Sequence, residues 1–547
     1  MLGCTCCVHH GGNDGGAQSP CVPPHVWMAP MTTTALSSDA AAASSRPIRF
    51  YHRGAIVSVQ GQPGTRSVLD WLREDAHSSG TKEGCNEGDC GACTVVLGEL
   101  DAAGELQLTN VNACIQFLPT LDGKALFTVE DLAPLATGSA TLHPVQQALV
   151  DCHGSQCGFC TPGFAMSLWH SYEAHQQCGT RPTRQQLADD LSGNLCRCTG
   201  YRPILDAGER MFDLPAARLD RAAITQALQG LAQEPALTYS ASNRAANTAR
   251  TDHFHAPRTL QELAALRQAL PQARLLAGST DIGLWVNKQF RDLGDLIYLG
   301  KVPELRAVEE RGQELWIGAG ATLEEAWAAL AARAPTLTDV WLRFASPPIR
   351  HTGTMGGNVA NGSPIGDAPP ILMALDADVE LRRGDAMRRL PLTGFYLDYM
   401  QNALQEGEFV QAIVVPLAAF ARQLRGYKVS KRFDCDISAL CAGMAIDLDG
   451  DTVRSVRLAY GGMAATVKRA ARAEAALLGQ PWSQDSVCAA QQALAQDFQP
   501  LSDMRASSAY RLQVAQNLLQ RLWLETRAND PLDASATSVF SVMPHAV

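Results

Sequence analysis

The chain has 547 residues, of which 46% are hydrophobic and 18% charged, an ordinary composition for a globular protein. This length exceeds what one hydrophobic core supports, so we expect three or four domains. A formal net charge of −10 argues against nucleic acid or an anionic membrane as the main partner. No apolar run approaches the roughly 18 residues of a membrane span, and we expect a cytoplasmic protein with no membrane partner.

Seventeen cysteines occur in the chain. Without a signal peptide they suggest thiolate ligands in a reducing compartment rather than a disulfide scaffold. The amino-terminal tract Cys4–His10 resembles a metal-binding run. Gly- and Pro-rich sequence without periodicity follows it, and Met31 offers a second plausible start. We therefore expect residues 1–45 to be a disordered tail or an over-extended start, with metal delivery as the alternative.

The first structured segment, 46–133, has the pattern of a small mixed sheet. Residues 48–51 and 55–59 read as a hairpin, 67–73 as a helix, and 94–97 as a strand, with another strand leading into Cys114. This order places the loop rich in cysteine at the edge of the sheet.

Four cysteines in this segment have the spacing of a plant-type ferredoxin. Cys85, Cys90 and Cys93 form C-x4-C-x2-C, and Cys114 follows after twenty intervening residues. A [2Fe–2S] cluster needs four thiolates, and the intervening glycines let one loop wrap around it. Structural zinc is the alternative, although zinc motifs favour paired C-x2-C knuckles.

A second quartet lies in segment 134–213, whose periodicity is helical. Cys157 and Cys160 form one pair, and Cys196 and Cys198 form another after 35 intervening residues. The spacing alone also allows zinc. Together the two quartets indicate an electron carrier.

The remainder of the chain contains no cysteine quartet. We interpret 214–250 as a linker, 251–421 as alternating strands and helices, 422–530 as a last α+β unit, and 531–547 as a tail. Residues 274–283 and 354–358 are two Gly-rich turns that suit a pyrophosphate. Gly318-Ala319-Gly320 resembles a dinucleotide fingerprint, but Leu323 stands where the third glycine belongs, so we interpret it as packing.

The stretches 156–163 and 193–204 resemble the helical [2Fe–2S] domain of molybdenum hydroxylases almost letter for letter. From Pro47 to Thr526 the order cluster, cluster, FAD is similar to the small subunit of bacterial xanthine dehydrogenases. The resemblance implies an α+β multidomain fold. Its parts would be a β-grasp plant-type [2Fe–2S] domain, an all-helical [2Fe–2S] domain, an FAD-binding domain of the vanillyl-alcohol-oxidase (PCMH) type, and a C-terminal domain like that of the CO dehydrogenase flavoprotein.

The resemblance also assigns cofactor residues. One cluster would be held by Cys85, Cys90, Cys93 and Cys114, and the other by Cys157, Cys160, Cys196 and Cys198. The implied flavin contacts are Leu275, Leu276, Ala277, Gly278, Ser279, Thr280, Asp281, Ile282, Phe344, Thr354, Met355, Gly356, Gly357, Asn358, Asp367, Val410 and Lys428. Lys428 could equally be a solvated charge. Gln156 and Cys198 are the positions expected to face the pterin.

By the same resemblance, the chain would pass electrons from a molybdopterin cofactor through both clusters to FAD and then NAD. The molybdopterin would sit in a separate large subunit that oxidises hypoxanthine and xanthine, in a heterotetramer or larger assembly. No catalytic residue for hydroxylation is expected on this chain. One alternative is another molybdenum hydroxylase acting on an aldehyde or N-heterocycle, and another is a non-catalytic metal-binding assembly protein.

Overall fold

The computed structural model describes residues 45–135, 142–243 and 250–537. The predicted amino-terminal tail, with its Cys4–His10 tract, lies outside these residues apart from Ser45, as does most of the tail predicted after residue 530. None of the helices in the described ranges is long and apolar enough to cross a membrane.

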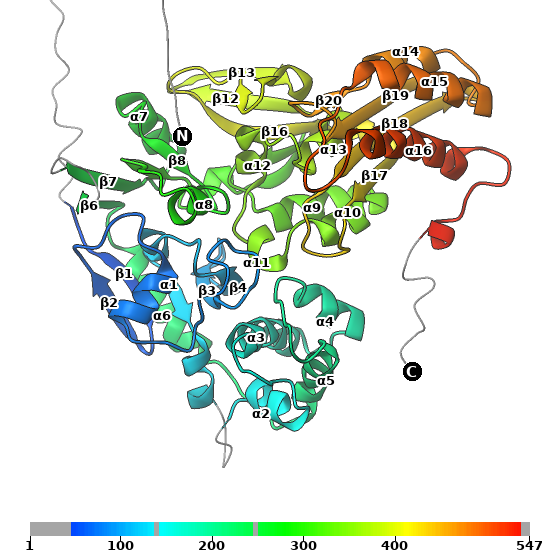
Figure 1. Cartoon of the computed structure of the whole chain (residues 1–547). Helices are drawn as coiled ribbons and strands as arrows, with labels where there is room; N and C mark the ends of the chain where they lie inside the picture. The colour runs from blue at the N-terminus through cyan, green and yellow to red at the C-terminus, as the bar shows by residue number, and fades with distance from the viewer. Residues whose placement is uncertain (1–44, 136–141, 244–249, 538–547) are drawn as a thin grey trace, which may run out of the picture. The chain divides into compact units, whose positions relative to one another are not determined.

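The first folded part is a five-stranded sheet in the order β2-β1-β5-β3-β4 (Figure 1). The predicted hairpin is confirmed, because Ile48 pairs with Val59 in antiparallel register. Strand β5 was not predicted, since three residues are too few to show a period. The helix predicted at 67–73 forms as the short helix α1 and continues as a π-helical segment, Trp71–Asp75. The elements are β1 (Ile48–His52), β2 (Ala55–Val59), α1 (Val68–Asp70), β3 (Thr94–Leu100), β4 (Leu106–Asn112) and β5 (Ala125–Phe127).

A helical part follows, as the sequence predicts. Its amino-terminal signals are strong: Thr183 caps one helix through the backbone N–H of Gln186, and three helices begin with proline in the first turn. Trp169 and Tyr172, both fully buried, anchor its core. The helices are α2 (Pro144–Asp151), α3 (Thr161–Cys178), α4 (Arg184–Asp190) and α5 (Arg202–Arg210).

The segment predicted as a linker, 214–250, contains regular structure: α6 (Arg221–Ala232) and β6 (Leu237–Asn243). Ile224, Leu228 and Leu231 are buried on one face of α6, in the same hydrophobic core as strand β3. These three residues recur at helical spacing, which predicts a buried helix face. The Ala- and Gln-rich composition of the segment does not indicate it.

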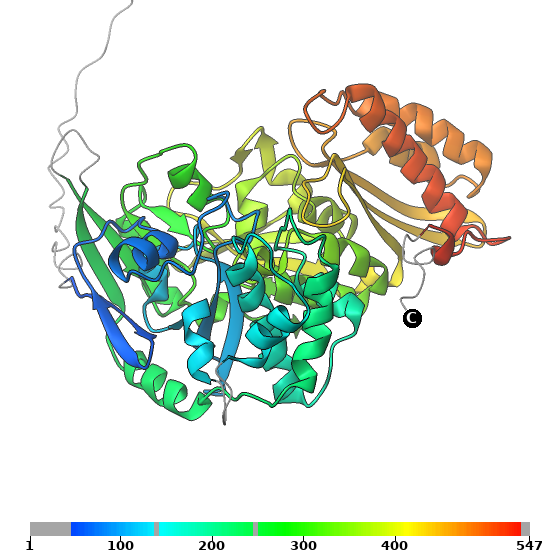
Figure 2. The same cartoon turned by 60° about the horizontal axis from the view of Figure 1, so that its bottom comes forward.

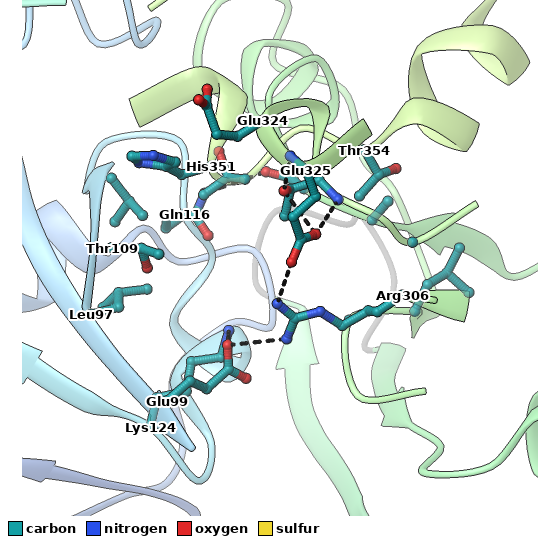
Figure 3. Close-up of a pocket in the computed structure, with 18 of the residues that line it drawn as sticks. Leu97, Glu99, Thr109, Gln116, Lys124, Arg306, Glu324, Glu325, His351 and Thr354 are labelled. Atoms are coloured by element: carbon teal, nitrogen blue, oxygen red, sulfur yellow. Dashed lines mark hydrogen bonds and ion pairs between the residues drawn. The ribbon is translucent and has the colours of Figure 1, made fainter. Parts of the chain in front are cut away.

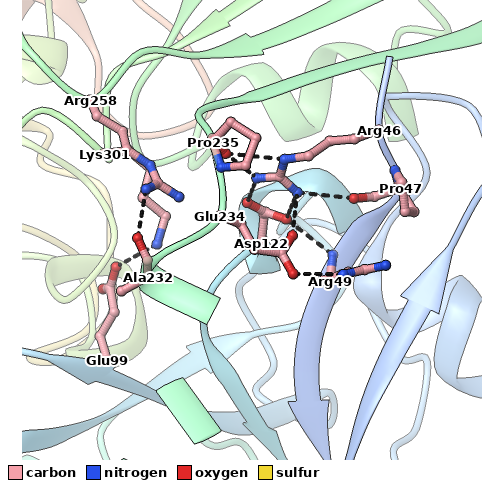
Figure 4. A network of polar contacts seen from close by, with 10 residues as sticks. All are labelled: Arg46, Pro47, Arg49, Glu99, Asp122, Ala232, Glu234, Pro235, Arg258 and Lys301. Atoms are coloured by element: carbon pink, nitrogen blue, oxygen red, sulfur yellow. Dashed lines mark hydrogen bonds and ion pairs between the residues drawn. The ribbon is translucent and has the colours of Figure 1, made fainter. Parts of the chain in front are cut away.

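Polar contacts fasten the end of this segment to the first sheet (Figure 4). Arg46 donates to both Asp122 carboxylate oxygens, at 2.7 and 2.8 Å, and to the carbonyl oxygen of Pro235. Arg49 pairs with Glu234 at 2.7 Å. The stretch between α6 and β6 is thus held against the residues at the start of the first sheet before the chain enters the third part.

The third part contains two larger sheets, in the orders β6-β7-β9-β8 and β10-β11-β16-β12-β13, and a small β14-β15 hairpin. Helices cover the second sheet, and its core includes the fully buried Trp327. The strands are β7 (Arg250–Ala256), β8 (Arg274–Leu276), β9 (Leu296–Tyr298), β10 (Val308–Arg311), β11 (Glu314–Gly318), β12 (Asp378–Arg383), β13 (Ala386–Pro391), β14 (Tyr396–Asp398), β15 (Gln401–Asn402) and β16 (Phe409–Pro416). The helices are α7 (Leu260–Ala269), α8 (Ile282–Asn287), α9 (Leu323–Arg333), α10 (Thr338–Arg343), α11 (Pro347–Arg350), α12 (Met355–Asn361) and α13 (Ala368–Ala374).

The last part is a four-stranded antiparallel sheet, β17-β18-β19-β20, with three helices on one face (Figure 2). Alternate residues of its strands point to opposite sides: Met444 packs toward those helices and Ala445 toward the core of the third part. The elements are β17 (Gln423–Val429), β18 (Leu440–Asp449), β19 (Thr452–Gly461), β20 (Lys468–Arg469), α14 (Ala471–Leu477), α15 (Gln484–Asp497) and α16 (Ser508–Thr526). The predicted α+β multidomain architecture is confirmed.

Candidate cofactor sites

The first cysteine quartet converges in the loop between α1 and β3. Backbone N–H groups of Asp89 and Cys90 donate to the sulfur of Cys85, each at 3.3 Å. A hydrogen bond with the Cys90 thiol lowers the pKa of Cys85 to about 5. The Cys114 thiol is likewise hydrogen-bonded to that of Cys93. This hydrogen bond, together with burial, raises the pKa of Cys114. Cys93 and Cys114 are buried and Cys85 and Cys90 are half-buried, so this quartet is largely enclosed.

The second quartet lies between the ends of the helices. Cys160 is hydrogen-bonded to Cys196, and Cys157 to Cys198. Burial raises the pKa of Cys196, but hydrogen bonds from the Thr199 hydroxyl and from backbone N–H groups outweigh it and lower the pKa to about 7. Cys157 and Cys198 are exposed, whereas Cys196 is buried. This quartet therefore opens to the surface on one side.

Each quartet is arranged as two adjacent cysteine pairs. A two-iron cluster takes two thiolates on each iron, so this pairing fits [2Fe–2S]. N–H groups aimed at sulfur stabilise thiolates, which also suits the group. Among the described residues, no three His, Cys, Asp or Glu side chains are placed to hold a single metal ion.

The two Gly-rich turns of the third part lie against each other. A Cβ at Gly278 would fall 1.7 Å from the carbonyl oxygen of Thr352 and 2.7 Å from the Cα of Gly353, the two residues that lead into the second turn. Only glycine fits such close backbone approach. The loop between β8 and α8 therefore meets the turn that begins α12, as the shared assignment to a flavin requires.

Unsatisfied polar atoms gather at these turns. Ser279 Oγ, Asn358 Oδ1 and Asp367 Oδ1 are buried and have no hydrogen-bond partner in the structure. Buried polar groups are normally paired, so these orphaned atoms fit a polar ligand such as the flavin and its phosphates. Phe344 and Val410 lie with Met355 in the hydrophobic core beneath the turns.

The other expected flavin contacts complete this region. Leu276 is buried on β8, Ile282 begins α8, and burial raises the pKa of Asp281. Lys428 is not a solvated charge: its Nζ donates to Asp367 Oδ2 at 2.6 Å and to Ser438 Oγ at 2.8 Å. This buried pair joins β17 to the start of α13. The remaining predicted positions, Leu275, Ala277, Thr280, Thr354 and Gly357, lie within the two turns.

The enclosed quartet touches the helix that follows the first Gly-rich turn. Asn287, at the end of α8, donates its side-chain N–H to the carbonyl oxygen of Cys114 at 2.8 Å, and Lys288 Nζ donates to that of Cys85. Gln116 donates to the carbonyl oxygen of Gly278 at 3.3 Å. The candidate flavin region and the first quartet are thus in direct contact.

A cavity of about 190 Å³ lies between strands β3 and β4 and the third part (Figure 3). Charged residues line it, and Arg306 reaches both Glu99 and Glu325 at 3.7 Å. Gly320 also lines it, and Gly318 packs on Leu305, with a Cβ there falling 2.2 Å from the Leu305 carbonyl oxygen. These contacts agree with our interpretation of Gly318–Gly320 as a packing motif.

Gln156 and Cys198, predicted to face a pterin, are both exposed; Cys198 belongs to the second quartet, and Gln156 directly precedes Cys157 of that quartet. Two other residues were missed. Ser346, fully buried with an unpartnered hydroxyl, lies against Gly193 of the helical part, and Asn194 bridges the two quartets. Asn194 stands in the motif that the sequence singles out, but two of its partners, Gly91 and Thr94, are 103 and 100 residues away, and no local pattern reveals them.

Four family models match consecutive parts of the chain. They are the 2Fe-2S iron-sulfur cluster binding domain at 50–117, the [2Fe-2S] binding domain at 128–209, the FAD binding domain in molybdopterin dehydrogenase at 247–418, and the CO dehydrogenase flavoprotein C-terminal domain at 425–526. The class of protein is therefore an iron–sulfur flavoprotein.

Full-length relatives extend the comparison. Xanthine dehydrogenase of Drosophila pseudoobscura pseudoobscura is 32% identical over 485 residues, which are 79% of this chain and 35% of the relative. Aldehyde oxidase 4 of Cavia porcellus is 29% identical over 486 residues, which are 79% of this chain and 36% of the relative. The chain thus spans about a third of the length of these relatives. Carbon monoxide dehydrogenase from Hydrogenophaga pseudoflava has a solved chain with 31% identity and a TM-score of 0.47, covering 49% of this chain and 94% of its own.

Domain by domain, the chain is therefore similar to the iron–sulfur and flavin domains of molybdenum hydroxylases.

Proposed function

We propose that the chain is the electron-transfer subunit of a xanthine dehydrogenase. Cys85, Cys90, Cys93 and Cys114 would hold one [2Fe–2S] cluster, and Cys157, Cys160, Cys196 and Cys198 the other. Residues 275–282 and 354–358, with Phe344, Asp367, Val410 and Lys428, would hold FAD. When bound, these groups accept and release single electrons, and the flavin exchanges electron pairs with NAD.

One observation supports this function above the others: the three candidate sites are in contact in series. Leu195, next to Cys196, donates to the carbonyl oxygen of Cys90 at 3.0 Å. On the other side of the first quartet, Asn287 donates to the carbonyl oxygen of Cys114. A backbone hydrogen bond therefore links the exposed quartet to the enclosed quartet, and a side-chain hydrogen bond links the enclosed quartet to the flavin region.

The exposure of the second quartet supports a partner at that end. Cys157 and Cys198 face solvent beside Gln156, and Phe159 and Tyr201 are exposed apolar side chains in the same motifs. We propose that a molybdopterin-binding large subunit docks here, with Gln156 and Cys198 meeting the pterin. Exposed aromatic side chains are common at such interfaces.

We propose that the partner subunit oxidises xanthine. Xanthine is favoured by the similarity to xanthine dehydrogenases of flies, fungi and plants. An aldehyde is the second candidate, since an aldehyde oxidase is similar over the same share of the chain. The two are distinguished by assaying the reconstituted complex with xanthine and with an aromatic aldehyde.

The electron-transfer role is tested with the purified chain alone. Flavin-replete protein should pass electrons from NADH to an artificial acceptor with no large subunit present, and it should not oxidise xanthine. Gln156→Ala should leave this NADH activity unchanged and slow purine-dependent flavin reduction in the complex. Failure of the flavin-replete chain to accept electrons from NADH would contradict the proposed acceptor.

A further inference from the structure

The two candidate cluster loops are joined by backbone contacts rather than by side chains alone. Leu195 N–H donates to the carbonyl oxygen of Cys90 at 3.0 Å, so one hydrogen bond and one residue, Leu195, separate Cys90 from Cys196 along this path. Gly91 has a φ of +67°, and a Cβ there would fall 2.2 Å from the carbonyl oxygen of Gly193. A Cβ at Gly163 would fall 2.1 Å from the carbonyl oxygen of Gly91. These positions leave no room for a side chain.

One side chain fits into this junction and bonds to both sides of it. Asn194 is 3% exposed. Its Nδ2 donates to the carbonyl oxygen of Gly91 at 3.0 Å and to Thr94 Oγ1 at 3.1 Å. Its Oδ1 accepts a hydrogen bond from Ser167 Oγ at 2.6 Å. Both amide hydrogens and the amide oxygen are therefore engaged.

The partners of Asn194 are placed next to the cysteines of both quartets. Gly91 lies between Cys90 and Cys93, and Thr94 follows Cys93 directly. Ser167 lies on α3, the helix that begins after Cys160. A single buried amide thus links three segments that each carry cluster ligands.

We propose that Asn194 is a positioning residue that holds the two ligand loops at a fixed separation and keeps the Leu195–Cys90 hydrogen bond closed. The inference rests on the proposed function, in which both quartets hold [2Fe–2S] clusters. One electron at a time leaves one cluster and enters the other, with no proton or further reactant involved. Because tunnelling slows steeply as the gap widens, a loosened junction slows this exchange without removing either cluster.

Asn194→Ala tests the proposal, with Gln185→Ala as a matched control. Gln185 is an exposed amide on α4 whose side-chain N–H bonds to Asp189 of its own helix. After rapid mixing with NADH, freeze-quenched samples report each reduced cluster by its own paramagnetic resonance signal. In Asn194→Ala we expect the first signal at the wild-type rate and the second delayed several-fold. The control should match the wild type for both signals.

A static readout accompanies the kinetic one. In fully reduced Asn194→Ala, the spin–spin splitting between the two signals should weaken while the iron content stays at the wild-type level. Ser167→Ala, which removes the bond that orients the amide, should produce a smaller change in the same direction. If Asn194→Ala does not fold, the splitting measured in Ser167→Ala tests the positioning role instead.

The outcomes separate this inference from the proposed function. The proposed function is contradicted if the wild-type chain lacks iron, or if NADH does not reduce its flavin. Wild-type kinetics and splitting in folded, iron-replete Asn194→Ala contradict the positioning role and leave the proposed function standing.

Discussion

Lys428 and Asp367 form a 2.6 Å ion pair in which the side chains are only 1% and 7% exposed. The pair joins strand β17 of the last part to the start of α13 in the third part. Asp367 keeps its other carboxylate oxygen buried and unpartnered. A buried charge pair with one free acceptor suits a ligand-binding site better than a purely structural contact.

Lys428→Met should therefore lower flavin retention and stability together. Loss of one partner of a buried pair typically costs about 3–5 kcal/mol. Flavin content after gel filtration and the thermal unfolding midpoint measure the two effects. Lys431→Met is the control, because Lys431 is exposed on the following loop. Wild-type flavin content in Lys428→Met would remove Lys428 from the proposed flavin site.

Cys93→Ser should remove one cluster and leave the other. The quartets occupy different parts of the fold, and Cys93 belongs to the enclosed one. We expect the iron content to fall by about half, with one of two resonance signals lost. Cys157→Ser should remove the other signal, and Cys488→Ser, at an exposed cysteine outside both quartets, should remove neither. Loss of both signals from a folded Cys93→Ser protein would contradict independent sites.

Glu99→Gln should weaken the contact between the first and third parts. The Glu99 side chain is 28% exposed. It forms ion pairs with Lys301 at 3.2 Å, Lys124 at 3.3 Å and Arg306 at 3.7 Å (Figures 3 and 4). Although burial opposes ionisation, these three cations hold the pKa of Glu99 well below its usual value. Without the carboxylate the cations repel one another, and we expect a loss of about 1.5–3 kcal/mol.

The pH dependence of that loss has a definite sign. Because the folded-state pKa of Glu99 is depressed, its contribution is complete above the ordinary carboxyl pKa of about 4.3 and declines as the pH falls further. The difference in unfolding midpoint between Glu99→Gln and the wild type should shrink below about pH 4. Exposed Glu105→Gln is the control. A difference that does not change with pH would contradict the proposed charge interaction.

His351→Gln should make stability less sensitive to mild acid. Burial, followed by the nearby His170 and Arg350, lowers the pKa of His351 to about 3. An unfolded histidine binds a proton near pH 6.5, so the neutral buried ring favours folding above that pH and progressively less between about pH 6.5 and 3. Glutamine does not titrate and can keep the 2.7 Å hydrogen bond to Asn110.

The unfolding midpoint measured between pH 7 and pH 5 checks this prediction. The wild type should lose more stability over that range than His351→Gln, and His253→Gln, at an exposed histidine, should behave like the wild type. Equal slopes for His351→Gln and the wild type would show that His351 does not contribute to the acid sensitivity.

Much of the fold could be predicted because its signals are local. Alternation gave the hairpin of β1 and β2, and proline and capping residues mark the helices of the second part. The cysteine quartets are conspicuous by spacing alone. Strand β5 and helix α6 were missed, since the first is too short for a pattern and the second has an unremarkable composition. Asn194 and Glu99 have polar partners in other parts of the fold, and Ser346 lies against Gly193 of the helical part; such long-range contacts leave no local pattern.

The central claim is that this chain carries two [2Fe–2S] clusters and one flavin in contact with one another. Metal analysis together with flavin extraction, on anaerobically purified full-length protein, tests it most directly. We predict about four irons and one FAD per chain, with little zinc. Stoichiometric zinc in place of iron, or folded iron-replete protein that binds no flavin when FAD is supplied, would contradict the claim.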